Sequence, residues 1–232
     1  MITNGQTMLD APTPSAYQPL LQVKNIRQAY NHRAILKNIS FQLVDSEIVT
    51  ILGRNGTGKT TLLKVLAKLL KPLSGTIDTY PGCRGVSLFL PDGFLYDTLT
   101  LHENLDLYRH LSGADPDWQH DIAERLGLGD FMHTQVRDLS RGQKIRGALC
   151  RCFLLKASLY LLDEPFTGLD PTSIEKLSQL LKFLRTQGKT IVLATHQIDS
   201  LLGISDRWWQ IQNGQLHDLT DPLRLMEEWK NL

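Results

Sequence analysis

The sequence predicts an α/β fold with a largely parallel sheet, and three features lead to that prediction. Short apolar runs at 47–53, 158–164 and 189–196 are typical of strands buried on both faces. Segments beside them carry the 3.6-residue apolar period of helices, most clearly at 63–71 and 171–188. Because strands alternate with helices along the chain, we expect βαβ units whose strands run parallel.

Composition narrows the class of protein. The chain has 232 residues, of which 42% are hydrophobic, and this suits one compact domain with a buried core. Its 25 Lys and Arg balance 24 Asp and Glu without a basic cluster, which argues against a nucleic-acid partner. The sequence shows neither a bilayer-spanning run of roughly 18 apolar residues nor a secretory signal, so we expect a soluble cytosolic protein with reduced cysteines.

The N-terminal part begins with a predicted tail and continues into strands. Residues 1–19 are rich in Thr, Pro, Ser and Asn, a composition typical of a flexible segment. Apolar residues alternate partly at 20–26 and more clearly at 34–43, which predicts two strands. The buried run at 47–53 ends in glycine and leads into the helix predicted at 63–71.

A middle region, about 92–152, is richer in helical periodicity. Two amphipathic helices are predicted there, at 101–113 and 115–131, each closed by glycine. A third helix should follow residue 143 and contains Gly147, which indicates either close packing or a weakened helix.

Two later helices have recognisable starts. Helix 171–188 has Asp170 as its expected N-cap and Pro171 at its first position. The segment 221–232 has Asp221 as N-cap and apolar residues three apart, which predicts a short amphipathic helix. That helix packs on its own domain or contacts another subunit.

The segment GRNGTGKT, residues 53–60, matches the phosphate-binding pattern G-x-x-x-x-G-K-[ST] and lies between a predicted buried strand and a helix. Its three glycines are expected to adopt positive φ and to bring N–H groups against phosphate: Gly53, Gly56 and Gly58. Lys59 should reach the β- and γ-phosphates, and the Thr60 hydroxyl should ligate Mg²⁺. We expect the following residues to bind the nucleotide: Gly53, Arg54, Asn55, Gly56, Thr57, Gly58, Lys59, Thr60 and Thr61.

The segment LYLLDEP, residues 159–165, places Asp163 at the carboxyl end of a buried strand, where ligands bind in open α/β sheets. Asp163 is predicted to hold Mg²⁺ together with Thr60, and Glu164 is the natural general base for an attacking water. Two solvated charges at a strand end are the alternative, which the phosphate-binding loop upstream disfavours.

Further segments resemble motifs of the ATP-binding cassette (ABC) ATPases. LSRGQ, at 139–143, resembles their LSGGQ signature, and GLD, at 168–170, resembles their D-loop. His196 ends an apolar strand and is similar to their switch histidine, and Tyr30 lies where the family places an aromatic residue against adenine. Each residue also has an ordinary interpretation by itself, such as a helix cap for Ser140 or a half-buried strand position for Tyr30.

The resemblance covers about residues 20–216 and implies a P-loop NTPase fold. It implies a RecA-like, mainly parallel core, an N-terminal antiparallel β subdomain and an inserted helical subdomain, with the ATPase domain at 20–220. It implies ATP and Mg²⁺ as ligands and three catalytic residues: Lys59, Glu164 and His196. It also implies that two such domains pack head-to-tail, each presenting to the other's nucleotide its Ser140, Gly142, Gln143 and Asp170.

The sequence departs from the family pattern at three places. Arg141 replaces the middle glycine of the signature, and a glycine lies within the next helix at Gly147. The region 88–105 lacks the glutamine that normally touches the metal, and Pro91 or Asp92 occupies its place. Asp92 either substitutes for that glutamine as a hard oxygen ligand or starts a surface turn.

The resemblance is greatest to export-type ATPases, including the haem-exporter and ABC-2 groups. It implies a peripheral subunit on the cytoplasmic side of the cell membrane, with transmembrane permease subunits and a second ATPase subunit as partners. A soluble ABC ATPase acting on DNA or ribosomes is disfavoured by the single cassette and the absence of a heptad run. A weakly hydrolysing regulatory cassette is the other alternative, and the missing glutamine keeps it open.

Overall fold

The computed structural model describes residues 18–31, 33–91, 93–197, 201 and 203–224, and a six-stranded sheet lies at its centre. The strand order is β5-β6-β7-β3-β8-β9. The strands are β3 (Ile48–Leu52), β5 (Val86–Phe89), β6 (Leu159–Asp163), β7 (Thr190–Thr195), β8 (Arg207–Gln212) and β9 (Gln215–Asp218). All neighbours pair in parallel except β8 and β9, so the predicted largely parallel sheet is confirmed.

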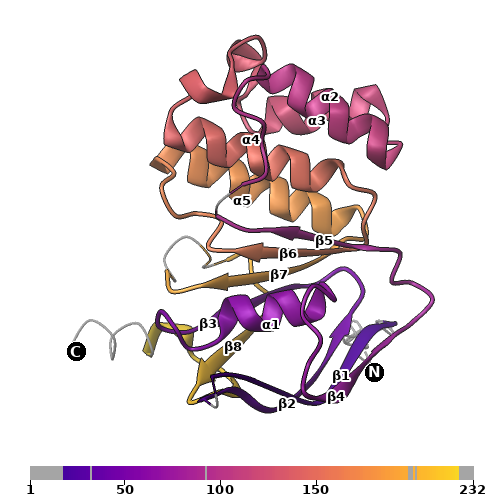
Figure 1. Cartoon of the computed structure of the whole chain (residues 1–232), viewed down its shortest axis with the longest axis vertical. Coiled ribbons are helices and arrows are strands. Elements are labelled where there is room, and N and C mark those ends of the chain that lie inside the picture. The colour runs from indigo at the N-terminus through magenta and orange to yellow at the C-terminus, as the bar shows by residue number, and fades with distance from the viewer. Residues whose placement is uncertain (1–17, 32, 92, 198–200, 202, 225–232) are drawn as a thin grey trace, which may run out of the picture.

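A second sheet of three antiparallel strands has the order β2-β1-β4. Its strands are β1 (Pro19–Tyr30), β2 (Arg33–Val44) and β4 (Ser74–Thr79), so the strands predicted at 20–26 and 34–43 are confirmed. Helix α1 (Lys59–Leu66) lies between the two sheets (Figure 1). Its apolar residues belong to one hydrophobic core with residues of both sheets.

Helix α1 is shorter than predicted, because the prediction extended it to residue 71. The chain leaves the helix after Leu66, and Lys68 has a φ of 58°, in the left-handed region. The N–H groups of Leu69 and Leu70 then both bond to the carbonyl oxygen of Lys64, which closes the helix end. The apolar period continues beyond this point, but the backbone does not follow it.

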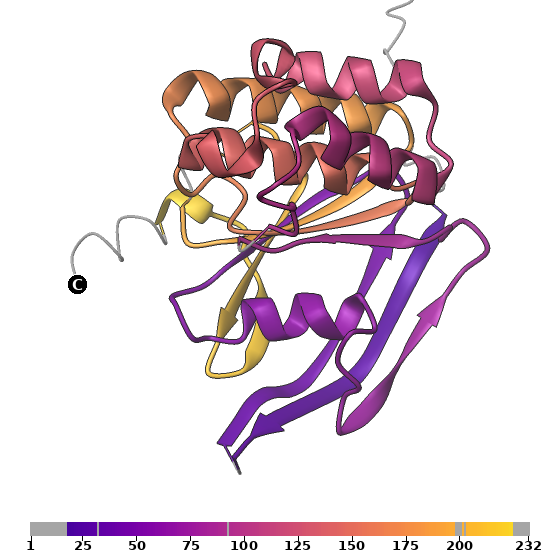
Figure 2. The same ribbon diagram turned by 45° about the horizontal axis from the view of Figure 1, so that its top comes forward.

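Four helices cover the opposite face of the six-stranded sheet, and Figures 1 and 2 show them stacked away from α1. They are α2 (Leu101–Ser112), α3 (Pro116–Arg125), α4 (Arg141–Leu154) and α5 (Pro171–Thr186), with 3₁₀ turns at Gly129–Phe131 and Val136–Asp138. A second hydrophobic core joins these helices to the sheet. A helix was predicted at 115–131, and this prediction is wrong beyond Arg125. Gly127 has a φ of 63°, which turns the chain out of the helix.

Gly147 is buried in α4, and a Cβ there would lie 2.8 Å from Cδ1 of Leu101 in α2. This contact favours close packing over the weakened-helix interpretation. The three cysteines are free thiols in the structure, with Cys150 and Cys152 buried. Within the described ranges, none of the helices has the length and apolar character that crossing a membrane requires.

Three predictions lie wholly or largely outside the described residues: those for the tail 1–19, for Asp92 and for the helix 221–232. Asp221 is described, and its Oδ1 atom accepts N–H bonds from Leu223 and Arg224 at 3.1 and 3.2 Å. This is the bonding expected of the predicted N-cap.

Candidate functional site

The loop between β3 and α1 brings its glycines into two different roles. Gly56 and Gly58 have φ values of 80° and 109°, as predicted. The prediction of positive φ is wrong for Gly53. A Cβ at Gly53 would lie 2.6 Å from Oγ1 of Thr57 and 2.7 Å from Cγ2 of Ile211 in β8. Glycine is therefore required at Gly53 by packing and not by backbone conformation.

We expect Gly53→Ala to lower the free energy of unfolding by about 1–3 kcal/mol, the usual cost of forcing extra volume into a packed site. Urea denaturation measures this loss. Gly82→Ala is the matched control, because its φ is ordinary and a Cβ there would have no neighbour closer than 3.4 Å. Equal stability of the two variants would contradict the packing role.

Lys59 lies at the first position of α1, where the helix offers unbonded N–H groups to an anion. Its ammonium donates to the carbonyl oxygens of Gly53, at 2.6 Å, and of Arg54, at 3.4 Å. It also lies 3.3 Å from Oε1 of Glu164, and its side chain is buried. The loop therefore holds one cation at the helix N-terminus beside a carboxylate.

Thr60 and Asp163 form a pair of oxygen ligands next to that lysine. The Thr60 hydroxyl donates to Oδ2 of Asp163 at 2.6 Å, while Oδ1 of Asp163 is buried with no hydrogen-bond partner. Burial raises the pKa of Asp163, and the bond from Thr60 offsets part of that rise. A hydroxyl and a carboxylate with an unpartnered oxygen are hard donors of the kind that Mg²⁺ prefers, so the residues fit this ion.

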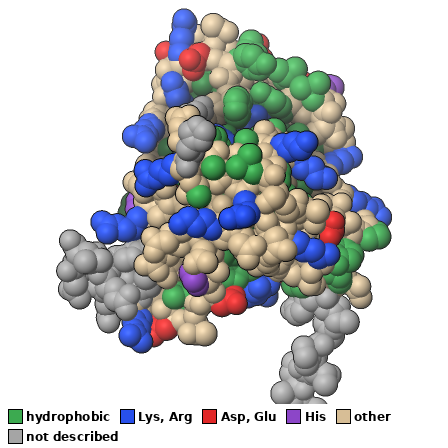
Figure 3. Space-filling view, turned by 60° about the horizontal axis from the view of Figure 1, so that its bottom comes forward, with side chains coloured by type: hydrophobic (Ala, Val, Ile, Leu, Met, Phe, Trp, Pro, Cys, Tyr) green, Lys and Arg blue, Asp and Glu red, His purple; other side chains and the backbone are tan. Residues whose placement is uncertain are grey.

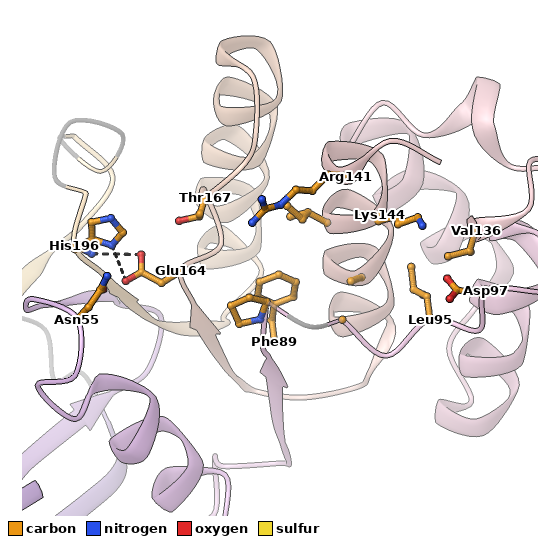
Figure 4. Close-up of a pocket in the computed structure, with 14 residues that line it drawn as sticks. Asn55, Phe89, Leu95, Asp97, Val136, Arg141, Lys144, Glu164, Thr167 and His196 are labelled. Carbon is orange, nitrogen blue, oxygen red and sulfur yellow. Dashed lines mark hydrogen bonds and ion pairs between the residues drawn. The ribbon is translucent and has the colours of Figure 1, made fainter. Parts of the chain in front are cut away.

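Glu164 follows β6 in a left-handed conformation, with a φ of 49°, and its carboxylate is held from two sides. The Thr195 hydroxyl donates to Oε2 at 2.8 Å, and Nδ1 of His196 lies 2.9 Å from Oε1 (Figure 4). Burial raises the pKa of Glu164, but the bonds from His196 and Thr195 and the charge of Lys59 together lower it below its usual value. The side chain is therefore an ionised carboxylate at neutral pH, able to accept a proton.

Thr195 also contacts this carboxylate, although its role was not predicted from the sequence. It is the last residue of β7, directly before His196, and its buried hydroxyl also accepts the N–H of Gln197 at 3.0 Å. A hydroxyl at the carboxyl end of a buried strand is the signal that could have identified it.

A cavity of about 220 Å³, the phosphate cavity, lies over the loop and brings several predicted residues together. Its predicted members are Tyr30, Asn55, Gly56, Gly58, Lys59, Thr60, Thr61, Asp163 and Glu164. Tyr30 ends β1 and is partly exposed beside it. Three other loop residues, Gly53, Arg54 and Thr57, do not line it, and the carbonyl of Arg54 accepts the Thr57 N–H at 3.3 Å.

A larger cleft of about 600 Å³ joins this site to the helical part of the molecule. Asn55, Glu164 and His196 border it on one side, and Arg141 and Lys144 of α4 border it on the other (Figure 4). Asn55 and Glu164 therefore border both cavities.

Two residues of the LSRGQ segment, Ser140 and Gln143, form hydrogen bonds with each other at the start of α4. Ser140 caps α4: its Oγ accepts the Gln143 N–H at 3.3 Å, and Oε1 of Gln143 accepts the Ser140 N–H at 2.7 Å. Gly142 lies in the first turn. Asp170 caps α5 by accepting the Ser173 N–H at 2.9 Å. The structure does not bring Ser140, Gly142, Gln143 or Asp170 to the phosphate cavity of the same chain.

Comparisons with known proteins agree with this geometry. The family model described as ABC transporter matches residues 36–167. The thiamine import ATP-binding protein ThiQ of Vibrio cholerae is 30% identical over 215 residues, covering 87% of this chain and 90% of ThiQ. The taurine import ATP-binding protein TauB of Pelagibacter ubique is 35% identical, covering 78% of this chain and 73% of TauB. The lantibiotic transport ATP-binding protein SrtF of Streptococcus pyogenes is 26% identical, covering 85% of this chain and 89% of SrtF.

Two similar solved structures are also ATP-binding parts of ABC transporters. A structure described as the ATP-binding subunit of an ABC transporter superposes with a TM-score of 0.77 at 26% identity, covering 90% of this chain and 93% of that one. A nucleotide-free ATP-binding cassette from an ABC transporter, 20% identical, also gives a TM-score of 0.77 and supports the fold. The predicted P-loop NTPase fold is thus confirmed, and the chain belongs to the family of ABC transporter ATP-binding proteins.

Proposed function

We propose that this chain binds and hydrolyses ATP with Mg²⁺ and thereby drives a substrate across a membrane. The observation that carries the proposal is one network of charges and hydroxyls beside the phosphate-binding loop. It contains Lys59, Thr60, Asp163, Glu164 and His196. The relatives named above include import and lantibiotic-transport proteins, so the export-type specificity stays a prediction.

Each residue of the network has a role in this proposal. Lys59 and the N–H groups at the start of α1 bind the phosphates, and Tyr30 contacts the base at the rim. Thr60 and Asp163 hold Mg²⁺, which neutralises charge on the phosphate oxygens when it is bound. Glu164 accepts the proton of the attacking water. His196 and Thr195 orient that carboxylate, and His196 also contacts the γ-phosphate.

The second half of each site comes from another ATPase subunit. Ser140, Gly142, Gln143 and Asp170 stand apart from the phosphate cavity of their own chain, which leaves them available to a nucleotide held by a partner. The N-terminus of α4 supplies a hydroxyl and N–H groups for that contact. Two chains then enclose ATP head-to-tail and separate after hydrolysis, while permease subunits bind them at the cytoplasmic surface of the membrane.

We expect Ser140→Ala to weaken ATP-driven dimerisation in a Glu164→Gln background, because it removes the hydroxyl offered to the partner's nucleotide. Thr100→Ala is a matched control, since Thr100 forms the same kind of capping box on α2. Each substitution should cost about 1 kcal/mol of unfolding free energy. Urea denaturation measures that loss, and ultracentrifugation with ATP measures the dimer. Equal dimerisation of both variants would contradict the role of Ser140.

One observation supports a second function, a regulatory cassette that hydrolyses weakly beside a different ATPase. No glutamine occurs at 88–105, where the family has its metal-contacting residue. Hydrolysis by the purified chain, measured alone and with its membrane subunits, separates the two functions. Clear Mg²⁺-dependent turnover that the membrane subunits stimulate supports the transport ATPase. Negligible turnover in both conditions supports the regulatory cassette.

A further inference from the structure

Positive charge is concentrated in the part of the molecule that contains the three-stranded sheet and α1. Residues 18–91 carry ten Lys and Arg side chains but only three Asp and Glu side chains, although the whole chain is nearly balanced. Two of the ten belong to the phosphate-binding loop, and eight lie elsewhere. Figure 3 views the molecule from the end where β1, β2 and β4 lie in Figure 1, and it shows Lys and Arg side chains spread over that face. Such a charge asymmetry within one chain indicates an anionic partner.

The loop 67–73, which joins α1 to β4, presents leucine side chains to solvent between lysines. Leu69 and Leu73 are each 69% exposed. Lys68 and Lys71, which lie between and beside them in the sequence, are exposed as well. Single exposed leucines are ordinary on a protein surface, but two of them in one short basic loop have the composition of a segment that enters the interface of an anionic membrane.

The backbone of this loop is held at both ends. The N–H of Leu70 donates to the carbonyl oxygen of Lys64 at 3.1 Å, and the Leu70 side chain packs against the hydrophobic core. At the other end, the N–H of Leu73 donates to the carbonyl oxygen of Arg27 in β1 at 2.9 Å. The exposed leucines are therefore presented in a fixed arrangement, so that binding through them loses little conformational entropy.

An open hollow of about 550 Å³ begins at the residue after Leu73 and offers groups that bind phosphate. It is lined by Lys24, Asn25, Arg27, Asn38, Ser74, Gly75 and Thr76. Lys24 pairs with Asp78 at 3.0 Å, whereas Arg27 forms no ion pair with any residue that the structure describes. A guanidinium beside amide and hydroxyl groups suits the oxygens of a phosphate group. The hollow shares no lining residue with the phosphate cavity over the nucleotide-binding loop.

We name the following residues the leucine–lysine patch: Lys24, Arg27, Lys68, Leu69, Lys71 and Leu73. We propose that the leucine–lysine patch binds the anionic lipid surface of a membrane, with lipid phosphate groups against the cations and the two leucines in the interface. The inference goes beyond the proposed function, because the lipids themselves are the partner and no membrane subunit is needed. The patch follows the C-terminal end of α1, whereas the phosphate-binding loop precedes its N-terminal end, so bound lipid leaves the phosphate cavity accessible.

Two features favour lipid over other partners. A nucleic acid would use the cations but gives exposed leucines no contact, since its outer surface is a phosphate backbone. A second copy of the same patch would bring like charges together, which repel each other. An anionic lipid surface suits both kinds of side chain, because it offers phosphate groups above an apolar layer.

Two double substitutions separate the apolar contribution from the charges. Leu69→Gln with Leu73→Gln keeps the cations, and we expect it to weaken vesicle binding by about tenfold. Lys68→Gln with Lys71→Gln should weaken binding by about twentyfold, at about fivefold for each charge. All four side chains are exposed, so both variants should melt at the wild-type temperature.

The test uses the full chain and protein-free vesicles of phosphatidylcholine, either alone or with about one third phosphatidylglycerol. Cosedimentation measures binding, which we expect only with the anionic vesicles and which should weaken as salt is added. Leu111→Gln is the control for the leucines, because Leu111 is 73% exposed on α2. Lys182→Gln is the control for the lysines, because Lys182 is exposed on α5. Both controls should bind as the wild type does.

Several results would overturn the inference. They are no binding of the wild type to anionic vesicles, equal binding to neutral vesicles, or wild-type affinity of either double variant. Equally tight, lysine-dependent binding of single-stranded RNA that the leucine substitutions leave unchanged would identify a nucleic-acid surface instead. A dimer in ultracentrifugation without nucleotide, lost in the leucine variant, would identify a contact between copies. All of these results leave the proposed transport function standing, and hydrolysis of ATP by both double variants at the wild-type rate would verify that the nucleotide site is intact.

Discussion

Glu164→Gln is expected to slow ATP hydrolysis by at least about a hundredfold while ATP binding is retained. The carboxylate is the base in the proposed reaction, and its pKa is already below the usual value, so it is ready to accept a proton at neutral pH. Glutamine has the same shape and can still accept the bond from Thr195, but it cannot take up the proton. Single-turnover hydrolysis and nucleotide titration measure the two effects separately.

Loss of hydrolysis should also stabilise the ATP-bound dimer of Glu164→Gln. Glu175→Gln is a suitable control, because Glu175 lies on α5 and its side chain accepts a hydrogen bond only from nearby Gln179 among the residues described. That variant should hydrolyse ATP at the wild-type rate. Undiminished hydrolysis by Glu164→Gln would refute the role of Glu164 as base. A monomer in ultracentrifugation with ATP would contradict head-to-tail dimerisation of the isolated subunit.

Sequence patterns predicted the central features of the fold because those features depend on neighbouring residues. Buried strands need continuous apolar runs, and the runs at 158–164 and 189–196 correspond to β6 and β7. Helix caps are equally local. Asp170 bonds to Ser173, and Ser140 bonds to Gln143, so each cap is visible within four residues. The phosphate-binding loop was predicted for the same reason, since its glycines and lysine act within eight positions.

Other features depend on packing between distant segments and were not predictable. Gly53 needs to be glycine because Ile211 of β8 approaches it. Thr195 reaches Glu164 because the register of β6 and β7 places Asp163 beside Ala194. Arg151 meets Phe94 and Tyr108 only after the segments that carry them have packed together. In each case the residue types are visible in the sequence, but their partners are set by strand order and helix contacts.

Asp163→Asn is expected to separate metal binding from the stability of the fold. Burial and the nearby charge of Glu164 raise the pKa of Asp163, and its Oδ1 atom has no hydrogen-bond partner. Ionisation of the Asp163 carboxyl group is therefore less favourable in the free chain than in water. Asparagine can still accept the bond from Thr60, so we expect the melting temperature without nucleotide to stay the same or rise.

With ATP present, the same substitution should strongly reduce both ATP hydrolysis and the stabilisation that Mg²⁺ adds. A carboxylate ligand to Mg²⁺ contributes several kcal/mol to the transition state, so hydrolysis should fall by about a hundredfold or more. The rise in melting temperature that ATP and Mg²⁺ together give the wild type should shrink to the rise seen with ATP and a chelator. Asp138→Asn is the control, because that side chain is largely exposed, and it should change neither quantity. If Asp163→Asn melts at a lower temperature without nucleotide, the carboxylate stabilises the fold itself. If its Mg²⁺ dependence is unchanged, the metal is held by other residues.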